Sequence, residues 1–318
     1  MRVSVIGNGR WGSFLAWYLG GCRHEVTLYG RPGSDRTRQF EATRRNNLLE
    51  LPQAVALTTD LGAVLENEVI LVSVPSQNLR ALMEELHAAG ARNKLFVLCM
   101  KGLEIGSGKR LSVVAGEAAP DNRVAVWLGP GHVQEFVREV PNCMVIDAQN
   151  EADKRWLVEE FTGELIRFYY GEDMIGNEVG AAAKNVVGIA AGLLDGYGLS
   201  SLKGALMSRG TREYARLILA LGGSELSAYG LCHLGDYEAT VFSRHSHNRQ
   251  FGENLALGKG YDQLAEGCHT VKALMELQRQ TRVELPISDA VYRVLYDGLD
   301  PRKALDALFS RSIKQEFA

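Results

Sequence analysis

The sequence predicts an α/β protein with a doubly wound, mostly parallel sheet, followed by an all-α region. Short apolar runs alternate with amphipathic stretches through the first half of the chain, and long helical patterns replace them after about residue 173. Such alternation is typical of a parallel sheet that helices cover on both faces. We therefore expect a first domain over residues 1–173 and a second, helical domain over residues 174–318.

The elements of the first domain follow from the period of its apolar residues. The expected strands are short apolar runs at 2–6, 25–29, 69–74, 94–98, 124–128, 143–147 and 165–169. The expected helices lie between them, at 12–19, 78–89, 108–118 and 151–161, with the charged run 36–45 as a solvated helix. In a sheet of this kind, ligands bind at the carboxyl ends of the strands.

The second domain begins with a segment rich in glycine and alanine, at 175–195. Small side chains let helix backbones approach closely, so we predict a buried central helix there. Further helices are expected at 205–221, 262–281 and 287–297, with a partly exposed helix over 302–318. Glycines at 222–223 and 258–260 separate them.

Composition excludes several classes of protein. A net charge of −3 over 318 residues gives no reason to expect a nucleic-acid partner. No apolar run reaches the roughly 18 residues that a membrane span needs. The five cysteines form no Cys-x-x-Cys pair and are expected to be reduced thiols. Because a core strand begins at residue 2 and leaves no room for a signal peptide, we expect a cytoplasmic protein.

A glycine-rich loop joins the first strand to the first helix, with the order Gly7-Asn8-Gly9-Arg10-Trp11-Gly12. In a dinucleotide-binding βα unit the first glycine makes a tight turn, the second lets the backbone approach the pyrophosphate, and the third lets the helix pack on the strand. The helix N-terminus then offers N–H groups to the phosphates. The loop predicts a Rossmann domain that binds NAD or NADP.

The second strand ends in Tyr29-Gly30-Arg31, where NAD-specific proteins usually carry an acidic residue for the ribose 2′-hydroxyl. Arg31 could instead pair with the 2′-phosphate of NADP, since arginine suits phosphate geometry. NADP is therefore expected to be accepted and preferred, with an ordinary surface charge as the alternative for Arg31. Pro75 follows the third expected strand at the same edge of the sheet.

Two lysines are candidates for catalysis. Lys184 lies in the middle of the small-residue helix, where burial would lower its pKa and suit it to proton transfer in carbonyl reduction. Lys101 follows the strand at 94–98, at the edge where ligands bind. The alternatives are that Lys184 reaches the surface and that Lys101 is a solvated loop charge. Cys232, His233, His245 and His247 do not form a familiar ligand spacing, so no metal is expected.

Many motifs in one order resemble those of the bacterial-type NAD(P)-dependent glycerol-3-phosphate dehydrogenases, almost from end to end. They include Val74-Pro75-Ser76, Lys101-Gly102, Gly129-Pro130, the run from Gly180 to Val186 around Lys184, Ser208-Arg209-Gly210 with Glu213, Leu234-Gly235-Asp236, Ser246 to Gly252, Glu266-Gly267 and Leu285-Pro286-Ile287. The resemblance implies a Rossmann domain followed by an all-α domain like that of 6-phosphogluconate dehydrogenase. It also implies interconversion of dihydroxyacetone phosphate and sn-glycerol 3-phosphate, which feeds glycerophospholipid synthesis, and a homodimer.

The resemblance further implies roles for individual residues. Lys184 would give the proton to the C2 oxygen, Lys101 would contact the substrate oxygens and the cofactor, and Asp236 would orient Lys184 or a substrate hydroxyl. The residues expected at the cofactor are Gly7, Gly9, Arg10, Trp11, Gly12, Arg31, Pro75, Lys101, Val133, His247 and Glu266. Those expected at the substrate are Lys101, Gly129, Gly131, Lys184, Asp236, Ser246, His247 and Asn248.

The chain departs from the family pattern at three places that bear on the substrate. Gly131 stands where the family carries a hydroxyl, with His132 in place of an aromatic residue. His247 replaces the arginine of a Ser-Arg-Asn motif, and the segment from Gly260 to Glu266 is shorter than usual. The changes indicate either drift in a working enzyme or compensation by Arg244, His245 or Arg249.

Three functions therefore stay open at this point. The first is glycerol-3-phosphate dehydrogenase. The second is a dehydrogenase of the same mechanism that acts on another small hydroxy or phosphorylated compound, because the altered residues gather at the substrate. The third is a catalytically silent NAD(P)-binding sensor, against which the presence of Lys101 and Lys184 argues, because a binder needs no proton donor.

Overall fold

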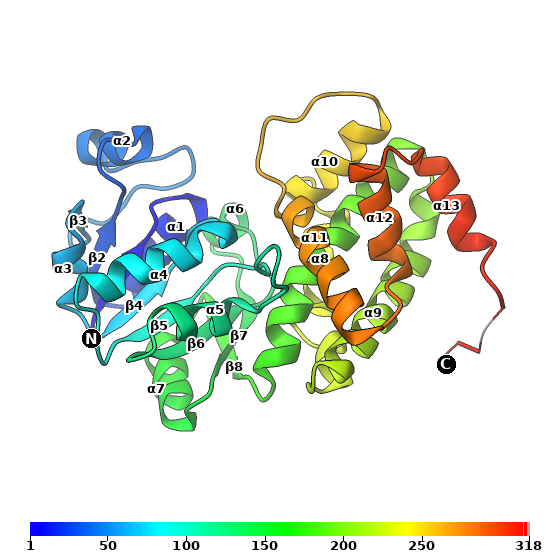
Figure 1. Ribbon diagram of the computed structural model, residues 1–318. Helices are drawn as coiled ribbons and strands as arrows, with labels where there is room; N and C mark the ends of the chain where they lie inside the picture. The colour runs from blue at the N-terminus through cyan, green and yellow to red at the C-terminus, as the bar shows by residue number, and fades with distance from the viewer. Residues whose placement is uncertain (314, 317–318) are drawn as a thin grey trace. The chain divides into compact units, whose positions relative to one another are not determined.

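The glycine-rich loop follows a strand in the interior of an eight-stranded sheet in the computed structural model, which describes residues 1–313, 315 and 316 (Figure 1). The chain forms two compact units. One contains residues 1–100 and 111–172, and the other contains residues 101–110 together with 173–318. The first unit holds the whole sheet, and the second is helical.

The sheet has the strand order β3-β2-β1-β4-β5-β6-β7-β8. Its strands are β1 (Arg2–Ile6), β2 (Glu25–Tyr29), β3 (Ala56–Thr58), β4 (Val69–Val72), β5 (Leu95–Leu98), β6 (Arg123–Leu128), β7 (Asn142–Ala148) and β8 (Ile166–Tyr170). All neighbours are parallel except β6 and β7. The strand order reverses direction at β1, which pairs with β2 on one side and β4 on the other. Ligands bind at such a switch point in open α/β sheets.

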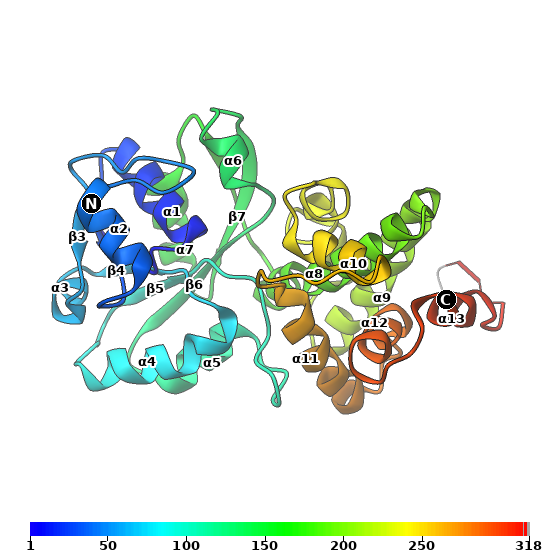
Figure 2. The same ribbon diagram turned by 90° about the horizontal axis from the view of Figure 1, so that it is seen from above.

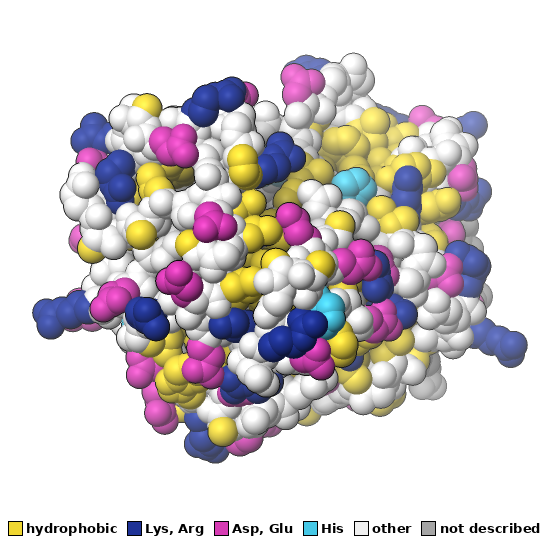
Figure 3. All heavy atoms as spheres, turned by 60° about the vertical axis from the view of Figure 1, so that its left-hand side comes forward, with side chains coloured by type: hydrophobic (Ala, Val, Ile, Leu, Met, Phe, Trp, Pro, Cys, Tyr) yellow, Lys and Arg dark blue, Asp and Glu magenta, His cyan; other side chains and the backbone are white. Residues whose placement is uncertain are grey.

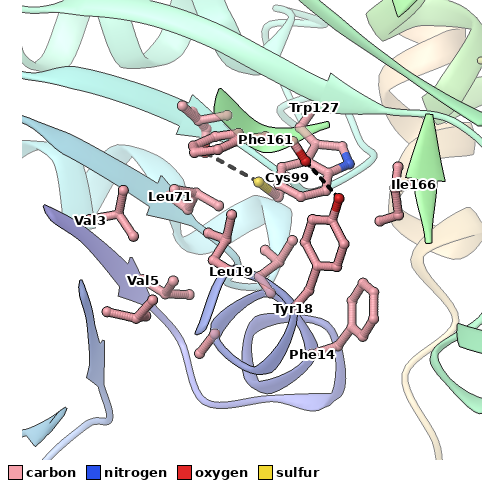
Figure 4. Packing of buried hydrophobic residues seen from close by; sticks show 14 of the residues in the cluster. Val3, Val5, Phe14, Tyr18, Leu19, Leu71, Cys99, Trp127, Phe161 and Ile166 are labelled. Atoms are coloured by element: carbon pink, nitrogen blue, oxygen red, sulfur yellow. Dashed lines mark hydrogen bonds between the residues drawn. The ribbon is translucent and has the colours of Figure 1, made fainter. Parts of the chain in front are cut away.

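Helices cover both faces of the sheet, as the alternating pattern predicted. They are α1 (Arg10–Gly21), α2 (Asp35–Thr43), α3 (Leu61–Leu65), α4 (Leu79–Ala88), α5 (Leu111–Ala118), α6 (Val133–Phe136) and α7 (Glu151–Phe161). Figure 2 shows α4 and α5 together on one side of the sheet and α1 on the other. On the α1 side, Phe14 and Leu19 pack with Trp127 and Phe161, and the Tyr18 hydroxyl donates to the Phe161 carbonyl at 2.6 Å (Figure 4).

The helical unit is built around α8 (Met174–Gly196), the buried helix that its small residues predicted. The other helices are α9 (Lys203–Ala220), α10 (His247–Ala256), α11 (Glu266–Thr281), α12 (Pro286–Tyr296) and α13 (Pro301–Phe309). Helices α8 and α10 approach so closely that glycine is required on both. A Cβ built on Gly192 would lie 2.0 Å from the Arg249 carbonyl oxygen, and one on Gly252 would lie 2.1 Å from the Ile189 carbonyl oxygen.

Some expected boundaries were wrong. The helix expected over 302–318 ends at Phe309, and its residues Lys314, Phe317 and Ala318 lie outside the described part of the chain. The helix expected from residue 262 begins at Glu266. Strand β3 and the short helices α3 and α6 were not predicted, because three to five residues are too few to establish a period.

The surface carries charges of both signs. Figure 3 shows acidic and basic side chains interspersed on the face that it draws, without a large patch of one sign. Among the described residues, no helix combines the length and the apolar character that crossing a membrane requires.

Candidate active site

The three glycines of the loop after β1 differ in what surrounds them. Gly7 has a φ of +106°, and a Cβ there would lie 2.2 Å from the Ser73 carbonyl oxygen. A Cβ on Gly12 would lie 1.7 Å from the Gly7 carbonyl oxygen. A Cβ on Gly9 would meet no atom closer than 3.8 Å. Gly7 and Gly12 are therefore required by the fold, whereas Gly9 leaves open space in front of the N-terminus of α1. This arrangement fits the pyrophosphate of a dinucleotide.

Other residues expected at the cofactor lie around this loop in the first unit. The Trp11 ring packs against Phe14, with centroids 5.0 Å apart, and contacts Phe136 at 6.2 Å. Arg10, Arg31 and Pro75 are exposed, Arg31 after β2 and Pro75 after β4. Both of these strands border β1.

The loop after β6 and the start of α6 hold three further candidates. Gly129 and Gly131 have φ values of +128° and +146°. A Cβ on Gly131 would lie 2.4 Å from the Phe136 ring, so a serine could not replace this glycine without a shift of that ring. The Val133 side chain is 2% exposed and belongs to the hydrophobic core, so only its backbone could face a ligand.

The helical unit brings both candidate lysines onto one aspartate. The Oδ2 atom of Asp236 lies 2.7 Å from Nζ of Lys184 and 2.6 Å from Nζ of Lys101. The side chains of Asp236, Lys184 and Lys101 are 1%, 9% and 21% exposed. Neither alternative for the lysines holds, because Lys184 does not reach the surface and Lys101 is not a solvated loop charge.

Burial sets the protonation of Lys184. Loss of solvation lowers its pKa from the ordinary value of 10.5 to about 7, and the nearby positive charge of Lys101 acts in the same direction, while the Asp236 carboxylate opposes the shift. A lysine with a pKa near neutrality can both give and take a proton under physiological conditions.

Sequence reasoning missed Thr240, which completes this cluster. Nζ of Lys184 donates to Oγ1 of Thr240 at 2.7 Å, and that hydroxyl donates to the Asp236 carbonyl at 2.7 Å. Thr240 lies in a five-residue π-helical turn, Glu238–Phe242, and such turns are frequent at functional sites. The only signal in the sequence is its position four residues after Asp236.

His233, three residues before Asp236, is a buried and neutral side chain. Burial lowers its pKa to about 4. Its Nδ1 donates to the Gly180 carbonyl at 2.8 Å, and its Nε2 accepts from the Tyr237 hydroxyl at 2.7 Å. The ring therefore supports α8 one turn before Lys184. No three His, Cys, Asp or Glu side chains in the described part of the chain are grouped to hold a metal ion.

The residues Ser246, His247 and Asn248 lie at the start of α10. Ser246 caps the helix, with its hydroxyl accepting from the Arg249 N–H at 3.3 Å. The Asn248 side chain donates to Asn185, the neighbour of Lys184, at 3.1 Å and accepts from the N–H of Gly267 at 2.9 Å. Because Gly267 follows Glu266, the starts of α10 and α11 are tied to the middle of α8.

Arg249 is not free to replace the arginine that His247 lacks. Its Nη1 lies 2.8 Å from Asp195 and 2.9 Å from Glu253, and its side chain is 12% exposed. Instead, Nδ1 of His247 lies 2.5 Å from the hydroxyl of Tyr261. Tyr261 belongs to the shortened segment before α11, so two of the three departures from the family pattern meet here.

Known families and relatives match most of this chain. The models of the NAD-dependent glycerol-3-phosphate dehydrogenase N-terminus and C-terminus match residues 2–154 and 173–306. A glycerol-3-phosphate dehydrogenase [NAD(P)+] of Desulfitobacterium hafniense is 36% identical over 99% of this chain and 93% of that protein. Its counterpart in a Thermoanaerobacter species is 34% identical over 99% of both chains.

Solved structures show the same relationship. The crystal structure of glycerol-3-phosphate dehydrogenase from Coxiella burnetii has a TM-score of 0.90 and 29% identity, covering 98% of this chain and 99% of that one. A ketopantoate reductase from Ralstonia eutropha, with a TM-score of 0.61, 16% identity and coverage of 96% and 99%, shares the fold alone. The chain belongs to the NAD-dependent glycerol-3-phosphate dehydrogenase family.

Proposed function

We propose that this protein reduces dihydroxyacetone phosphate to sn-glycerol 3-phosphate with NADPH or NADH, reversibly, and that the product feeds glycerophospholipid synthesis. The observation that carries the proposal is the contact of Lys101 and Lys184 with one oxygen of Asp236, with the pKa of Lys184 near 7. The names of the curated relatives support the same activity.

The cofactor would be held by the loop Gly7–Gly12 and the N–H groups at the start of α1, with Trp11, Pro75, the Val133 backbone, Lys101, His247 and Glu266 as further contacts. Bound there, it supplies the hydride for the C2 carbon and takes it back in the reverse direction. We propose that NADP is preferred and that Arg31 pairs with its 2′-phosphate.

Lys184 would give its proton to the C2 oxygen as that oxygen gains negative charge. Burial makes loss of this proton easier, which is the tuning that a general acid requires. Asp236 and Thr240 hold Nζ of Lys184 in place. The positive charge of Lys101 would stabilise the same oxygen. In the reverse direction, neutral Lys184 would take the proton from the C2 hydroxyl.

Two features of the helical unit could bind the phosphate and a hydroxyl group of the substrate. The N-terminus of α10, with Ser246, His247 and Asn248, offers N–H groups and a partial positive charge to a phosphate. The Oδ1 atom of Asp236 is buried and accepts no hydrogen bond from the described residues, so it could accept one from a substrate hydroxyl. Gly129 and Gly131 would contact the substrate through their backbone.

Residues 1–173 would thus supply most of the contacts to the cofactor, and residues 174–318 with Lys101 would supply most of those to the substrate. We further propose a cytoplasmic homodimer. Light scattering during gel filtration, which gives the mass of the particle, tests the dimer directly.

A single assay tests the activity. Protein, NADPH and dihydroxyacetone phosphate are mixed, and the absorbance of the reduced cofactor is followed. The proposal predicts oxidation of NADPH that Lys184→Ala abolishes. Cofactor binding without turnover on this or any other hydroxy acid or sugar phosphate would contradict it and favour a silent sensor.

One observation favours a second candidate, a dehydrogenase that acts on another small hydroxy or phosphorylated compound. His247 replaces an arginine, and Arg249 is engaged with Asp195. Losing a charge-assisted hydrogen bond costs about 1.5–3 kcal/mol, or roughly one to two decades of affinity. His247→Arg should therefore lower KM for dihydroxyacetone phosphate about tenfold if that compound is the substrate. An unchanged KM, with faster turnover of another compound, would favour the second candidate.

A further inference from the structure

Gly30 stands where an NAD-specific chain carries an acidic residue, and two neighbouring side chains occupy the space that a side chain would need there. A Cβ on Gly30 would lie 2.3 Å from Nδ2 of Asn8 and 2.4 Å from Oγ1 of Thr37. Any side chain at this position would displace both groups. A carboxylate for the ribose 2′-hydroxyl of NAD would therefore fit only if the Asn8 and Thr37 side chains shifted.

The two groups that occupy this space also tie the following turn to the glycine loop. Nδ2 of Asn8 donates to Oγ1 of Thr37 at 2.9 Å, and that hydroxyl donates to the Arg31 carbonyl at 2.9 Å. Oγ of Ser34 lies 2.7 Å from the same Oγ1 and caps α2. The start of α2 is thus held in a fixed position beside the loop after β1.

This position brings a second arginine to the glycine loop. Nη1 of Arg36 lies 3.8 Å from a Cβ built on Gly9, the glycine that otherwise faces open space. The structure gives neither Arg36 nor Arg31 an ion pair with a carboxylate of the described residues. Arg38, two positions further along the same helix, pairs with Asp35 and donates to the Gly33 carbonyl at 2.6 Å. Arg36 and Arg31 therefore keep their charge available beside the loop.

We propose that Arg36, acting with Arg31, determines cofactor specificity by binding the 2′-phosphate of NADP. Arginine offers paired N–H donors that match a phosphate dianion, and exposure lets its side chain close on a ligand without a desolvation penalty for burial. This inference rests on the proposed function only in requiring a dinucleotide at the glycine loop. Arg36 lies outside the motif Gly7–Gly12, so the motif alone does not identify it.

Two nucleotides isolate the 2′-phosphate from the rest of the cofactor. Calorimetry on the full chain compares adenosine 2′,5′-bisphosphate with adenosine 5′-monophosphate. The wild type should bind the bisphosphate at least about tenfold more tightly, which corresponds to one charge-assisted contact. Arg36→Gln should remove most of this difference and change the affinity for the monophosphate less than about twofold. Arg38→Gln, the matched control, should leave both affinities unchanged.

The outcomes separate this inference from the proposed function. An undiminished preference for the bisphosphate in Arg36→Gln would overturn the inference, as would a preference that Arg31→Gln alone abolishes completely. If Arg36→Gln acts as expected but the wild type does not reduce dihydroxyacetone phosphate, the inference stands and the proposed function fails. Because Arg36 is exposed, the variant should fold, and circular dichroism checks that it does.

Discussion

Two aspartates of the helical unit each lie between two cations, but their surroundings differ. Asp236 contacts Lys101 and Lys184. Asp195, near the end of α8, contacts Lys203 at 2.6 Å and Arg249 at 2.8 Å. The charge pattern is the same in both clusters, so charge alone does not distinguish a catalytic site from a structural one.

The difference lies in burial and in unused hydrogen-bonding capacity. Both oxygens of Asp195 accept hydrogen bonds, Oδ1 from Ser200 at 2.8 Å. Although burial alone would raise the pKa of Asp195, its hydrogen bonds from Lys203, Ser200 and Arg249 hold the pKa below its ordinary value. At Asp236, the Oδ1 atom accepts no hydrogen bond from the described residues, and the neighbouring Lys184 has a pKa of about 7. The Asp195 cluster is saturated, whereas the Asp236 cluster can move a proton and accept a ligand.

The largest expected effect comes from exchanging Lys184 of the Asp236 cluster, or Lys203 of the Asp195 cluster, for methionine. Lys184→Met should lower kcat about 10²–10⁴-fold, the usual contribution of a general acid. Its free energy of unfolding should not fall, because burial already disfavours the charged form of Lys184 and Lys101 still neutralises Asp236. Lys203→Met should do the opposite, keeping kcat and unfolding at a lower urea concentration. Equal losses of activity in both variants would show that the clusters do not differ in function.

Loss of the Thr240 hydroxyl should have a smaller effect on turnover. Thr240→Val keeps the shape of the side chain but removes the acceptor for Nζ of Lys184. We expect kcat to fall about tenfold, which corresponds to a loss of about 1.4 kcal/mol, the size of one hydrogen bond. Thr240→Ser restores the hydroxyl and should recover most of the rate. A serine variant as slow as the valine variant would indicate that packing, and not the hydrogen bond, is responsible.

The pH dependence of the reaction should follow Lys184. Reduction needs the protonated lysine, so its kcat should fall as the pH rises through about 7, whereas oxidation needs the neutral amine and should become faster. Because the Asp236 carboxylate raises this pKa, Asp236→Asn should move the falling limb to lower pH. A profile that Asp236→Asn leaves in place would show that another group titrates.

The smallest effect is expected for Asp195→Asn, which should destabilise the fold without slowing the reaction. Weakened hydrogen bonds to Lys203 and Arg249 should lower the free energy of unfolding by about 1–3 kcal/mol. Urea titration measures the loss, and kcat measured at the same temperature should match the wild type. A slower Asp195→Asn would extend the catalytic machinery beyond the Asp236 cluster.

Most of the fold was predictable because its signals are local. The period of the apolar runs predicted seven of the eight strands that the structure describes, and the small residues of α8 predicted a helix that packs closely on another. The short strand β3 and helix α6 carry no such period. The end of α13 at Phe309, where Ser310 caps the helix, was not predicted either.

The candidate site was predictable only where single residues carry the chemistry. Lys101, Lys184 and Asp236 were identified from motifs, and the structure brings them together. Thr240 was missed because its importance depends on which side chains the fold places beside it. The contact between Arg249 and Asp195 was missed for the same reason, because the two residues lie on different helices, α10 and α8, and only the close packing of those helices brings them together.

The most direct test of the account is the rate of hydride transfer from NADPH to dihydroxyacetone phosphate in a single turnover, measured for the wild type, Asp236→Asn and Asp195→Asn. We expect a loss of about 10²-fold or more in Asp236→Asn, because Lys184 loses the carboxylate that holds it and keeps it charged. Asp195→Asn should keep the wild-type rate. Equal rates in the two variants, or no transfer by the wild type, would contradict it.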